Sequence, residues 1–418
     1  MRSIVALLTG TVLSLRAVIA QEKLTNHPEG DPFIPRTSAH PAFYADTPRE
    51  YNLKWGNLTA RLQGSVQAEY NDNINLSERN PRSDFVFGPY LGLGFLWPVS
   101  ERNLLQFDIG LGYRAYLNNP SLNSIQISPD SRLSYQIRVL KALLTIHDQF
   151  SVEVDPLSRG ELSGVDNSLL NYRRFNNNLG FELSWEAMRE ITLLGGYDYV
   201  LDRSLTSDFL ELDRDDHVLR LAAYRPLSSR FTAGLSSSYT LSQYQLPIHN
   251  NGETLTIGPN LIARVSDFLT ADLSVGYTTA TYDQTGTIQD SSDFEGMSFS
   301  GGLKHRMNSR TTQTLRVVKN IDPGFQSNFT DVLSLQYGLE MKMAAALTLH
   351  GTFVFEDLSS SGRFGEESKR YLAYLGTKAR VSRRWLAGLS YSFGWKDSQL
   401  PGRDYTQNRI TLDVSHEF

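Results

Sequence analysis

The sequence contains no cysteine in its 418 residues. This absence excludes a disulfide framework and any metal site built on thiolates. The sequence also lacks an excess of positive charge, because 40 lysines and arginines stand against 45 aspartates and glutamates. Domains that bind nucleic acid are usually basic. The net charge of −5 therefore argues against a nucleic-acid partner.

Long hydrophobic runs are missing as well, apart from a short one near the N-terminus. Residues 4–15 are mostly apolar, whereas a membrane-spanning helix needs about 20 such residues. Arg2 precedes this run, and Val18-Ile19-Ala20 follows it in the manner of a small-residue cleavage site. We expect residues 1–20 to be a signal peptide that directs export.

Recognisable catalytic motifs are the third absence. The sequence has no P-loop, no GxSxG and no HExxH, and its eight histidines are scattered. We could assign no set of serine, histidine and acidic residues to a nucleophilic mechanism. We therefore expect a protein that is not an enzyme and that uses neither a cofactor nor a metal ion.

What the sequence does contain is a hydrophobic period of two, which begins at Leu58 and persists to the end. The first run reads LTARLQGSVQAEY, and its apolar and polar residues alternate. Successive side chains of a strand point to opposite faces, so this run predicts one apolar wall and one polar wall. The run has 13 residues, more than the usual 5–6 of a soluble strand. Tilted membrane-spanning strands need about 9–11 residues.

The pattern recurs in about eighteen runs, separated by connections that alternate in length. Eight connections are short and nine are longer and polar, and the series begins and ends with a long one. The runs start near residues 58, 84, 103, 125, 143, 170, 190, 216, 230, 253, 268, 294, 310, 328, 345, 369, 384 and 405. Short turns on one side and long loops on the other are typical of outer-membrane barrels.

The predicted fold is therefore all-β, a transmembrane antiparallel up-and-down barrel of about 18 strands over residues 58–418, with short periplasmic turns and long external loops. Sixteen strands remain an alternative, because residues 207–224 have a mixed period that also fits a helix in part. Pro89 and Pro259 fall inside expected strands, where we expect bulges because proline removes a ladder donor. Residues 21–57 contain five prolines and predict an irregular periplasmic arm. This arm is either a flexible leader or a partial block of the pore mouth.

Soluble β-sandwiches and propellers also alternate, but neither explains the whole pattern. Sandwich strands are usually short, and a propeller repeats a blade motif about every 40 residues. Aromatic residues also gather at the ends of the expected strands, where tryptophan and tyrosine suit a membrane interface. These residues are Trp97, Tyr116, Trp185, Tyr199, Trp385, Trp395 and Tyr405.

The polar faces of the strands supply the candidate pore-lining residues. The basic candidates are Arg61, Arg114, Arg132, Arg138, Arg220, Lys304, Arg316, Lys378, Arg380 and Arg409. The acidic candidates are Glu69, Asp108, Glu153, Glu182, Asp272, Glu340 and Asp413. Rings of one charge sign bias a pore towards counter-ions, so this mixed wall predicts at most a weak anion preference. Cross-strand pairing that stiffens the wall is the alternative role of these charges.

The expected partners follow from this location. Outer-membrane lipid would cover the apolar wall, and small polar solutes would occupy the lumen. Acidic residues in the long loops, such as Asp208 and Asp290, either bridge to lipopolysaccharide through divalent cations or remain solvated. A homo-oligomer is left open, because no subunit interface can be read from the pattern.

The last ten residues, RITLDVSHEF, form one more alternating run. We expect this run to be the closing strand and to pair with the strand near Leu58, which leaves the sheet without an edge. Val414, His416 and Phe418 resemble the C-terminal aromatic signal by which the outer-membrane insertion machinery recognises its barrels. His416 stands where that signal more often has tyrosine or phenylalanine.

The stretch VQAEYNDNINLSERNPRSDFVFGPYLGLGF, from Val66, resembles the start of the outer-membrane β-barrel porin family. Its aromatic residue and Asn/Asp-rich turn, Tyr70-Asn71-Asp72-Asn73-Ile74, carry the resemblance. The resemblance implies an outer-membrane barrel without catalytic residues. Passive diffusion of small polar solutes is the first functional hypothesis. Export of a polysaccharide or other polymer with a periplasmic partner, and a structural or adhesion barrel with an occluded lumen, are the alternatives.

Overall fold

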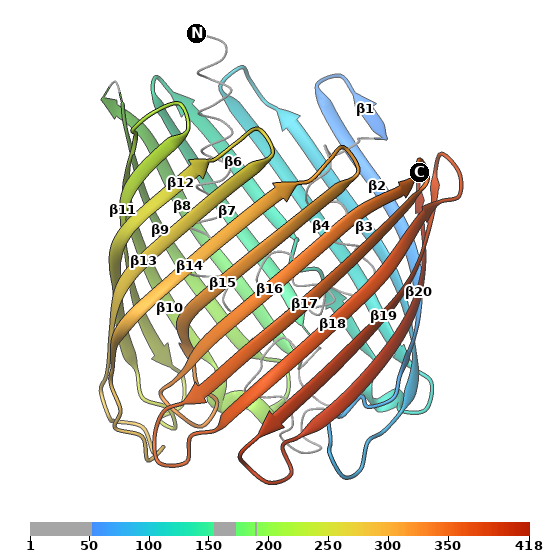
Figure 1. The fold of residues 1–418 in the computed structure, drawn as a ribbon, viewed down its shortest axis with the longest axis vertical. Helices are drawn as coiled ribbons and strands as arrows, with labels where there is room; N and C mark the ends of the chain where they lie inside the picture. The colour runs from blue at the N-terminus through green and yellow to red at the C-terminus, as the bar shows by residue number, and fades with distance from the viewer. Residues whose placement is uncertain (1–51, 154–172, 189) are drawn as a thin grey trace.

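The computed structural model describes residues 52–153, 173–188 and 190–418, which form one closed β-barrel (Figure 1). The expected signal peptide, most of the expected arm and the connection at 154–172 lie outside the described residues. No helix in the described part of the chain is long and apolar enough to cross a membrane.

Eighteen segments each cross the barrel wall once, and we call each of them a stave. All but the fourth and fifth staves are single strands of 13–16 residues. The first nine are β2 (Leu58–Asn71), β3 (Asp84–Pro98), β4 (Asn103–Tyr116), a fourth stave in two pieces, β5 (Ser124–Ile127) and β6 (Arg132–Val139), then β7 (Ala142–Glu153), β8 (Arg174–Met188), β9 (Ile191–Ser204), β10 (Arg214–Pro226) and β11 (Phe231–Tyr244). The remaining nine are β12 (Gly252–Arg264), β13 (Leu269–Tyr282), β14 (Phe294–Arg306), β15 (Thr311–Pro323), β16 (Phe329–Ala344), β17 (Leu347–Ser360), β18 (Glu367–Arg380), β19 (Trp385–Ser398) and β20 (Tyr405–Glu417). The predicted count of eighteen is confirmed, and the alternative of sixteen is wrong.

Each stave pairs antiparallel with its neighbours, and β20 pairs with β2 to close the ring. The pairing runs from Gln63 opposite Glu417 to Asn71 opposite Arg409. The backbone N–H of Phe418 donates to the carbonyl of Leu62 at 3.3 Å, so the seam continues to the last residue. Because the ring is closed, every stave has a partner on each side and the barrel wall has no open edge. The expected closing role of the C-terminal strand is confirmed.

A short strand, β1 (Leu53–Trp55), lies just before the first stave and pairs with β2 from Ala60 back to Leu58. It falls inside the expected arm, so the last residues of that segment are ordered against the barrel. The short turns, β1 and the C-terminus lie together at one end of the barrel, and the long connections lie at the other (Figure 1). We call these the short-turn end and the long-loop end.

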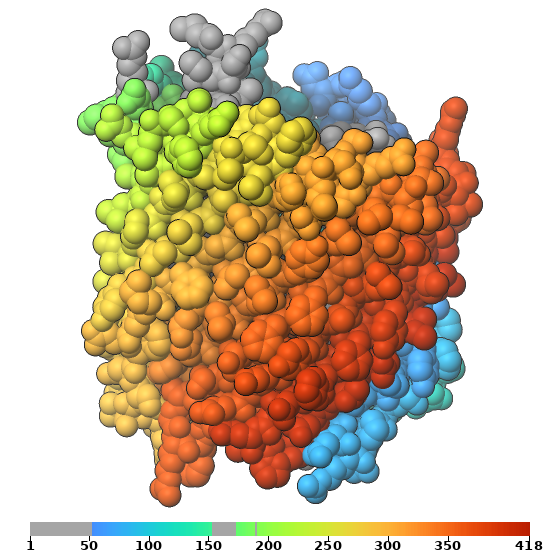
Figure 2. Space-filling view, in the orientation of Figure 1, coloured from blue at the N-terminus to red at the C-terminus, as the bar shows by residue number. Residues whose placement is uncertain are grey.

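The alternation read from the sequence becomes an outer and an inner face. On β20, the outward side chains of Ile410 and Leu412 are 51% and 52% exposed, whereas the inward side chain of Arg409 is 7% exposed. The same alternation holds on β2, where Val66 is exposed and Gln67 is buried. Figure 2 shows the outer face over β14 to β19 as a continuous surface. The apolar face is therefore the one that lipid would cover.

The segment at 207–224 contains both of the structures that its mixed period suggested. The turn η5 (Ser207–Leu212) is a 3-10 helix, and β10 follows it directly. Asp213 ends the turn in an extended conformation, with its backbone N–H bonded to the carbonyl of Leu210. The helical part of the sequence pattern thus corresponds to the connection, and the alternating part corresponds to the strand β10.

The bulges expected at the two prolines are not present. The β3–β4 ladder omits Gly88 and Pro89 but keeps the same register on both sides of them. The β12–β13 ladder does the same at Gly258 and Pro259. Each proline costs one ladder hydrogen bond without shifting the strands, because its fixed φ is compatible with an extended backbone.

The expected aromatic belt needs correction at two residues. Trp97, Trp185, Trp385 and Trp395 lie on the outer face and are 42–47% exposed, as a membrane interface requires. Tyr405 is instead only 2% exposed and packs against Leu76 on the inner side. Tyr116 also lies on the inner face, beside the guanidinium of Arg114 at 5.5 Å. Strand-end position alone did not distinguish the two faces.

Candidate functional site

The candidate site is the inner wall, onto which the register brings the predicted pore-lining residues. Sixteen of the seventeen lie in strands at positions whose side chains share the inner face. The side chain of Glu153, the last residue of β7, is outside the described part of the structure. Arg138, Lys304, Glu340 and Arg380 are exposed near the short-turn end, and the others lie deeper.

Glycines on the inner face recur between ionisable side chains of the two flanking strands. The middle strand carries no side chain at these points, so the flanking groups can approach each other across it. The pairs are Arg61 and Asp108 across Gly94, His147 and Asp198 across Gly180, Glu182 and Arg220 across Gly196, Asp272 and Arg316 across Gly302, and Lys378 and Asp413 across Gly388.

At four of these five glycines, all but Gly196, the space above the glycine is occupied by a carboxylate. A Cβ added at Gly302 would lie 2.5 Å from Oδ1 of Asp272, and one added at Gly388 would lie 2.2 Å from Oδ1 of Asp413. Across Gly180 the contact is direct, because His147 Nε2 lies 2.8 Å from Asp198 Oδ1. Opposite charges two strands apart are therefore neighbours here, and much of the wall charge is compensated within the wall.

Other inner charges pair between adjacent or nearby strands. Arg114 donates to Glu69 at 3.1 Å, and both side chains are at most 5% exposed. Arg220 forms an ion pair with Asp198, which therefore serves two partners. Asp198 is fully buried and was missed by sequence reasoning. Its inward position could have been read from the alternation of β9, but nothing in the sequence signalled its two partners.

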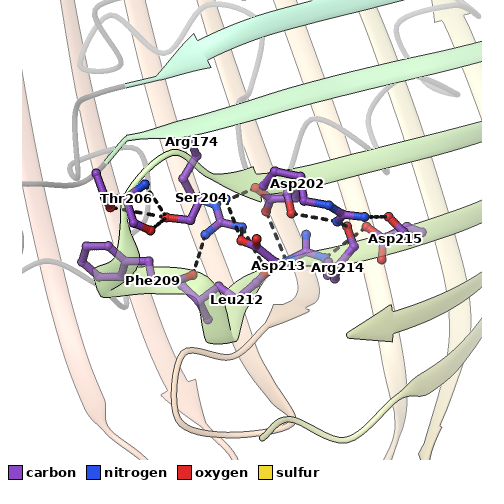
Figure 3. A network of polar contacts seen from close by, with 11 residues as sticks. Arg174, Asp202, Ser204, Thr206, Phe209, Leu212, Asp213, Arg214 and Asp215 are labelled. Atoms are coloured by element: carbon purple, nitrogen blue, oxygen red, sulfur yellow. Dashed lines mark hydrogen bonds and ion pairs between the residues drawn. The ribbon is translucent and has the colours of Figure 1, made fainter. Parts of the chain in front are cut away.

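A second group that sequence reasoning missed holds the β9–β10 connection at the long-loop end (Figure 3). The Arg174 side chain is fully buried, and its Nε donates to Asp202 at 2.6 Å. The same guanidinium donates to the carbonyls of Phe209 and Leu212 at 3.1 and 3.0 Å. Because Arg174 and Asp202 point inward from β8 and β9, these bonds place η5 against the inner wall.

Four further long connections are joined around Asp290. Its carboxylate accepts from the backbone N–H of Asn328 at 2.7 Å and from the hydroxyl of Ser361 at 2.5 Å. Asn250 Nδ2 donates to the carbonyl of Asp290 at 2.9 Å. Burial alone would raise the pKa of Asp290, but the hydrogen bonds from Asn328, Ser361 and Ser292 outweigh it and hold the pKa below the usual value.

The acidic loop residues are thus largely engaged in the loops' own hydrogen bonds. Asp283 accepts from the backbone N–H and the side chain of Asn251 at 3.1 and 2.8 Å. Among the described residues, no group of three or more histidine, aspartate and glutamate side chains is arranged to hold a metal ion. The geometry therefore supports a role for these acids in loop structure.

One loop residue predicts a response to acid. His249, in the β11–β12 connection, is 3% exposed and stacks on Tyr244 with 4.8 Å between ring centroids. Burial, together with the charge of Arg214, lowers the pKa of His249 from 6.5 to about 4. The unfolded chain takes up this proton below about pH 6.5, whereas the folded chain resists until about pH 4. The contribution of His249 to stability is therefore complete above pH 6.5 and is lost as the pH falls to 4.

We expect the His249→Gln variant to lose less stability on acidification than the wild type does. The difference in the free energy of unfolding between the variant and the wild type should change by about 2–4 kcal/mol between pH 7.5 and pH 4. This amount corresponds to the shift in the pKa of His249. Urea unfolding of the folded barrel in detergent at both pH values measures it. Equal losses in the two proteins would contradict the assignment.

Comparison with known proteins supports the same architecture. Residues 247–418, which are less than half of the chain and contain β12 to β20, match the family model described as Putative beta-barrel porin 2. No curated protein matches the chain.

Solved structures resemble the fold at low sequence identity. OccK2 (OpdF) of Pseudomonas aeruginosa, solved in complex with glucuronate, has a TM-score of 0.50 and is 9% identical, with 86% of this chain and 98% of that chain covered. OccAB3 of Acinetobacter baumannii has a TM-score of 0.49 and is 11% identical, with 86% and 99% covered. The likeness to OccK2 extends to the fold alone. Over residues 247–418 the chain is therefore similar to the Putative beta-barrel porin 2 family, and the whole described chain has the architecture of a closed outer-membrane barrel of eighteen antiparallel staves.

Proposed function

We propose that the protein is a passive diffusion channel for small polar solutes. The observation that carries this proposal is the inner wall, which is largely polar apart from small apolar clusters such as Leu194, Ala222 and Tyr224, and which stays accessible along part of its circumference. On β14 and β15 nearly all inward side chains are partly exposed, although they point away from lipid. An 18-stranded barrel is wide enough to hold water along such a wall. No chemical reaction is assigned to the protein.

The charge pairs across glycine predict how the channel selects its solutes. Pairs such as Asp272 with Arg316 and Lys378 with Asp413 cancel much of each other's field in the lumen. Rings of one sign are what give a pore strong ion selectivity. We therefore propose weak selectivity between small anions and cations, with size and polarity as the main filters.

The partners proposed here remain those of an outer-membrane barrel. Lipid covers the outer face, and the insertion machinery would recognise the closing strand through Val414, His416 and Phe418. Lipopolysaccharide would contact the outer face near the long-loop end, where the side chains of Lys319 and Asp331 form an ion pair at 2.9 Å. A homo-oligomer stays open within this proposal.

Reconstitution into planar lipid bilayers tests the proposed function. Folded protein should give discrete conductance steps, and a salt gradient should produce only a small reversal potential. Heat-unfolded protein in the same detergent is the control. A persistent absence of steps over repeated insertions, together with no swelling of proteoliposomes in small sugars, would favour the occluded structural barrel instead.

A further inference from the structure

The fourth stave is interrupted halfway across the wall. Leu111 pairs with Ile127 on β5, and Asp108 pairs with Arg132 on β6. Three steps along β4 therefore correspond to five steps along the fourth stave, which leaves two extra residues in the segment 128–131. We call this segment, Ser128-Pro129-Asp130-Ser131, the wall bulge. A similar offset of two residues exists against β7, where Ile127 pairs with Val152 and Arg132 with Gln149.

Inward side chains of the two flanking regions show that the wall bulge lies on the lumen side. Gln149 projects inward from β7, and its Nε2 donates to the carbonyl of Pro129 at 2.7 Å. Tyr90 projects inward from β3 and is hydrogen-bonded to Ser128. The inner face of Gly110 is covered by the same two groups, since an added Cβ would lie 2.2 Å from Tyr90 Oη and 2.7 Å from Ser128 Cβ.

The wall bulge is held by hydrogen bonds rather than left as a loose loop. The N–H of Ser128 donates to the carbonyl of Gly110 at 2.8 Å, and the N–H of Gly110 donates to Ser131 Oγ at 3.1 Å. The N–H of Ser131 closes the turn onto the carbonyl of Ser128 at 2.9 Å. Both serines are at most 1% exposed. Asp130, at the tip, is instead exposed.

The charges around the tip are mixed but not equally accessible. Asp130, Arg61 and Asp108 all lie within electrostatic range of Tyr90. Asp108 accepts from Gln106 at 2.8 Å and lies over Gly94 next to the wall. Asp130 is exposed at the tip of the wall bulge, whose residues Ser128 and Pro129 contact inward side chains. Its carboxylate is therefore accessible to solvent at this place in the wall.

We propose that the wall bulge is an inward step at mid-wall that narrows the passage, and that Asp130 sets the ion preference there. This inference rests on the proposed channel function. A fixed carboxylate at a narrow place attracts cations and repels anions. The carboxylate of Asp130 would offset the slight excess of basic residues among the predicted pore-lining residues. It would do so at the depth where ions pass closest to the wall.

Two variants test the inference in planar bilayers. Asp130→Asn keeps the shape of the bulge and should shift the reversal potential in a salt gradient towards anion preference. Deletion of residues 129 and 130 restores one-to-one register between Ile127 and Arg132 and should raise single-channel conductance by roughly 1.5-fold or more. Glu253→Gln, which removes an exposed charge from the outer face where Tyr239 donates to Glu253 at 2.9 Å, is the matched control and should leave both readings unchanged.

The outcomes separate this inference from the channel function. If the wild type conducts but Asp130→Asn has the wild-type reversal potential, Asp130 is not the selectivity residue and the inference fails. A wild type that never conducts overturns the channel function, and the inference with it. Heat-modifiable mobility in gels checks that each variant is folded, and Asp130→Asn decides the matter if the deletion does not fold.

Discussion

Replacing Arg174 by methionine should lower the free energy of unfolding by about 3–5 kcal/mol and release the β9–β10 connection from the inner wall. The guanidinium is fully buried and holds Asp202 together with the carbonyls of Phe209 and Leu212. Methionine fills a similar volume but donates nothing. The buried Asp202 carboxylate would then lose the Arg174 donor while it keeps its ion pair with Arg214 at 3.5 Å, and two carbonyls would lose a donor each. Leaving such buried groups unsatisfied costs more than the original pair contributes.

Urea unfolding in detergent, followed by tryptophan fluorescence, measures this loss. The matched control is Arg225→Met. Arg225 also forms an ion pair, with Glu190 at 3.1 Å, but both of these side chains are more than half exposed. Exposed pairs of this kind contribute about 0–1 kcal/mol. Protease sensitivity at residues 205–213 should rise in Arg174→Met only. Equal effects of the two substitutions would mean that Arg174 does not anchor the connection.

Deleting Phe418 should lower the amount of barrel assembled in the membrane far more than it alters the barrels that do fold. The ring of Phe418 lies against Gly64, where an added Cβ would be 3.4 Å from the ring. The centroids of the Phe418 and His416 rings are 4.7 Å apart. His416 in turn meets Trp385 at 4.6 Å. These contacts lie on the outer face at the very end of the β20–β2 seam, so a folded barrel loses little without them.

Quantifying the heat-modifiable form in isolated membranes tests this prediction. We expect a several-fold drop for the deletion, with wild-type single-channel conductance in the molecules that assemble. Phe418→Tyr keeps the terminal aromatic ring and serves as the control, which should assemble normally. Wild-type levels of folded protein in the deletion strain would rule out an assembly signal at this residue.

The number and direction of the staves could be predicted because they depend on local patterns. Two-residue alternation over 13 or more residues specifies a long strand with two different faces, whatever its neighbours are. The alternating short and long connections then fix the up-and-down order. The fourth stave was also located near residue 125, but its interruption was not foreseen. Ser-Pro-Asp-Ser reads equally well as a turn between strands or as an excursion within one.

The candidate site was predictable only in part, and the glycine positions show why. Alternation correctly placed Asp272 and Arg316 on one face, yet it could not show that they meet across Gly302. That meeting depends on the register of three strands far apart in the chain. The bulge expected at Pro89 was a wrong prediction made from a local property. Proline removes a ladder hydrogen bond at its own position, but the register of β3 and β4 is the same on both sides of it.

The sequence by itself determined the class of fold, the closing strand and the sign of each face, because these follow from the period of the side chains along one strand. Only the tertiary structure decided which charges compensate one another, where the wall steps inward at Asp130 and how Arg174 holds a connection inside the mouth. The physical reason is that contact across the barrel is set by register and by the space that glycines leave. Neither the register of the strands nor the space above a glycine can be read from a single segment of the chain.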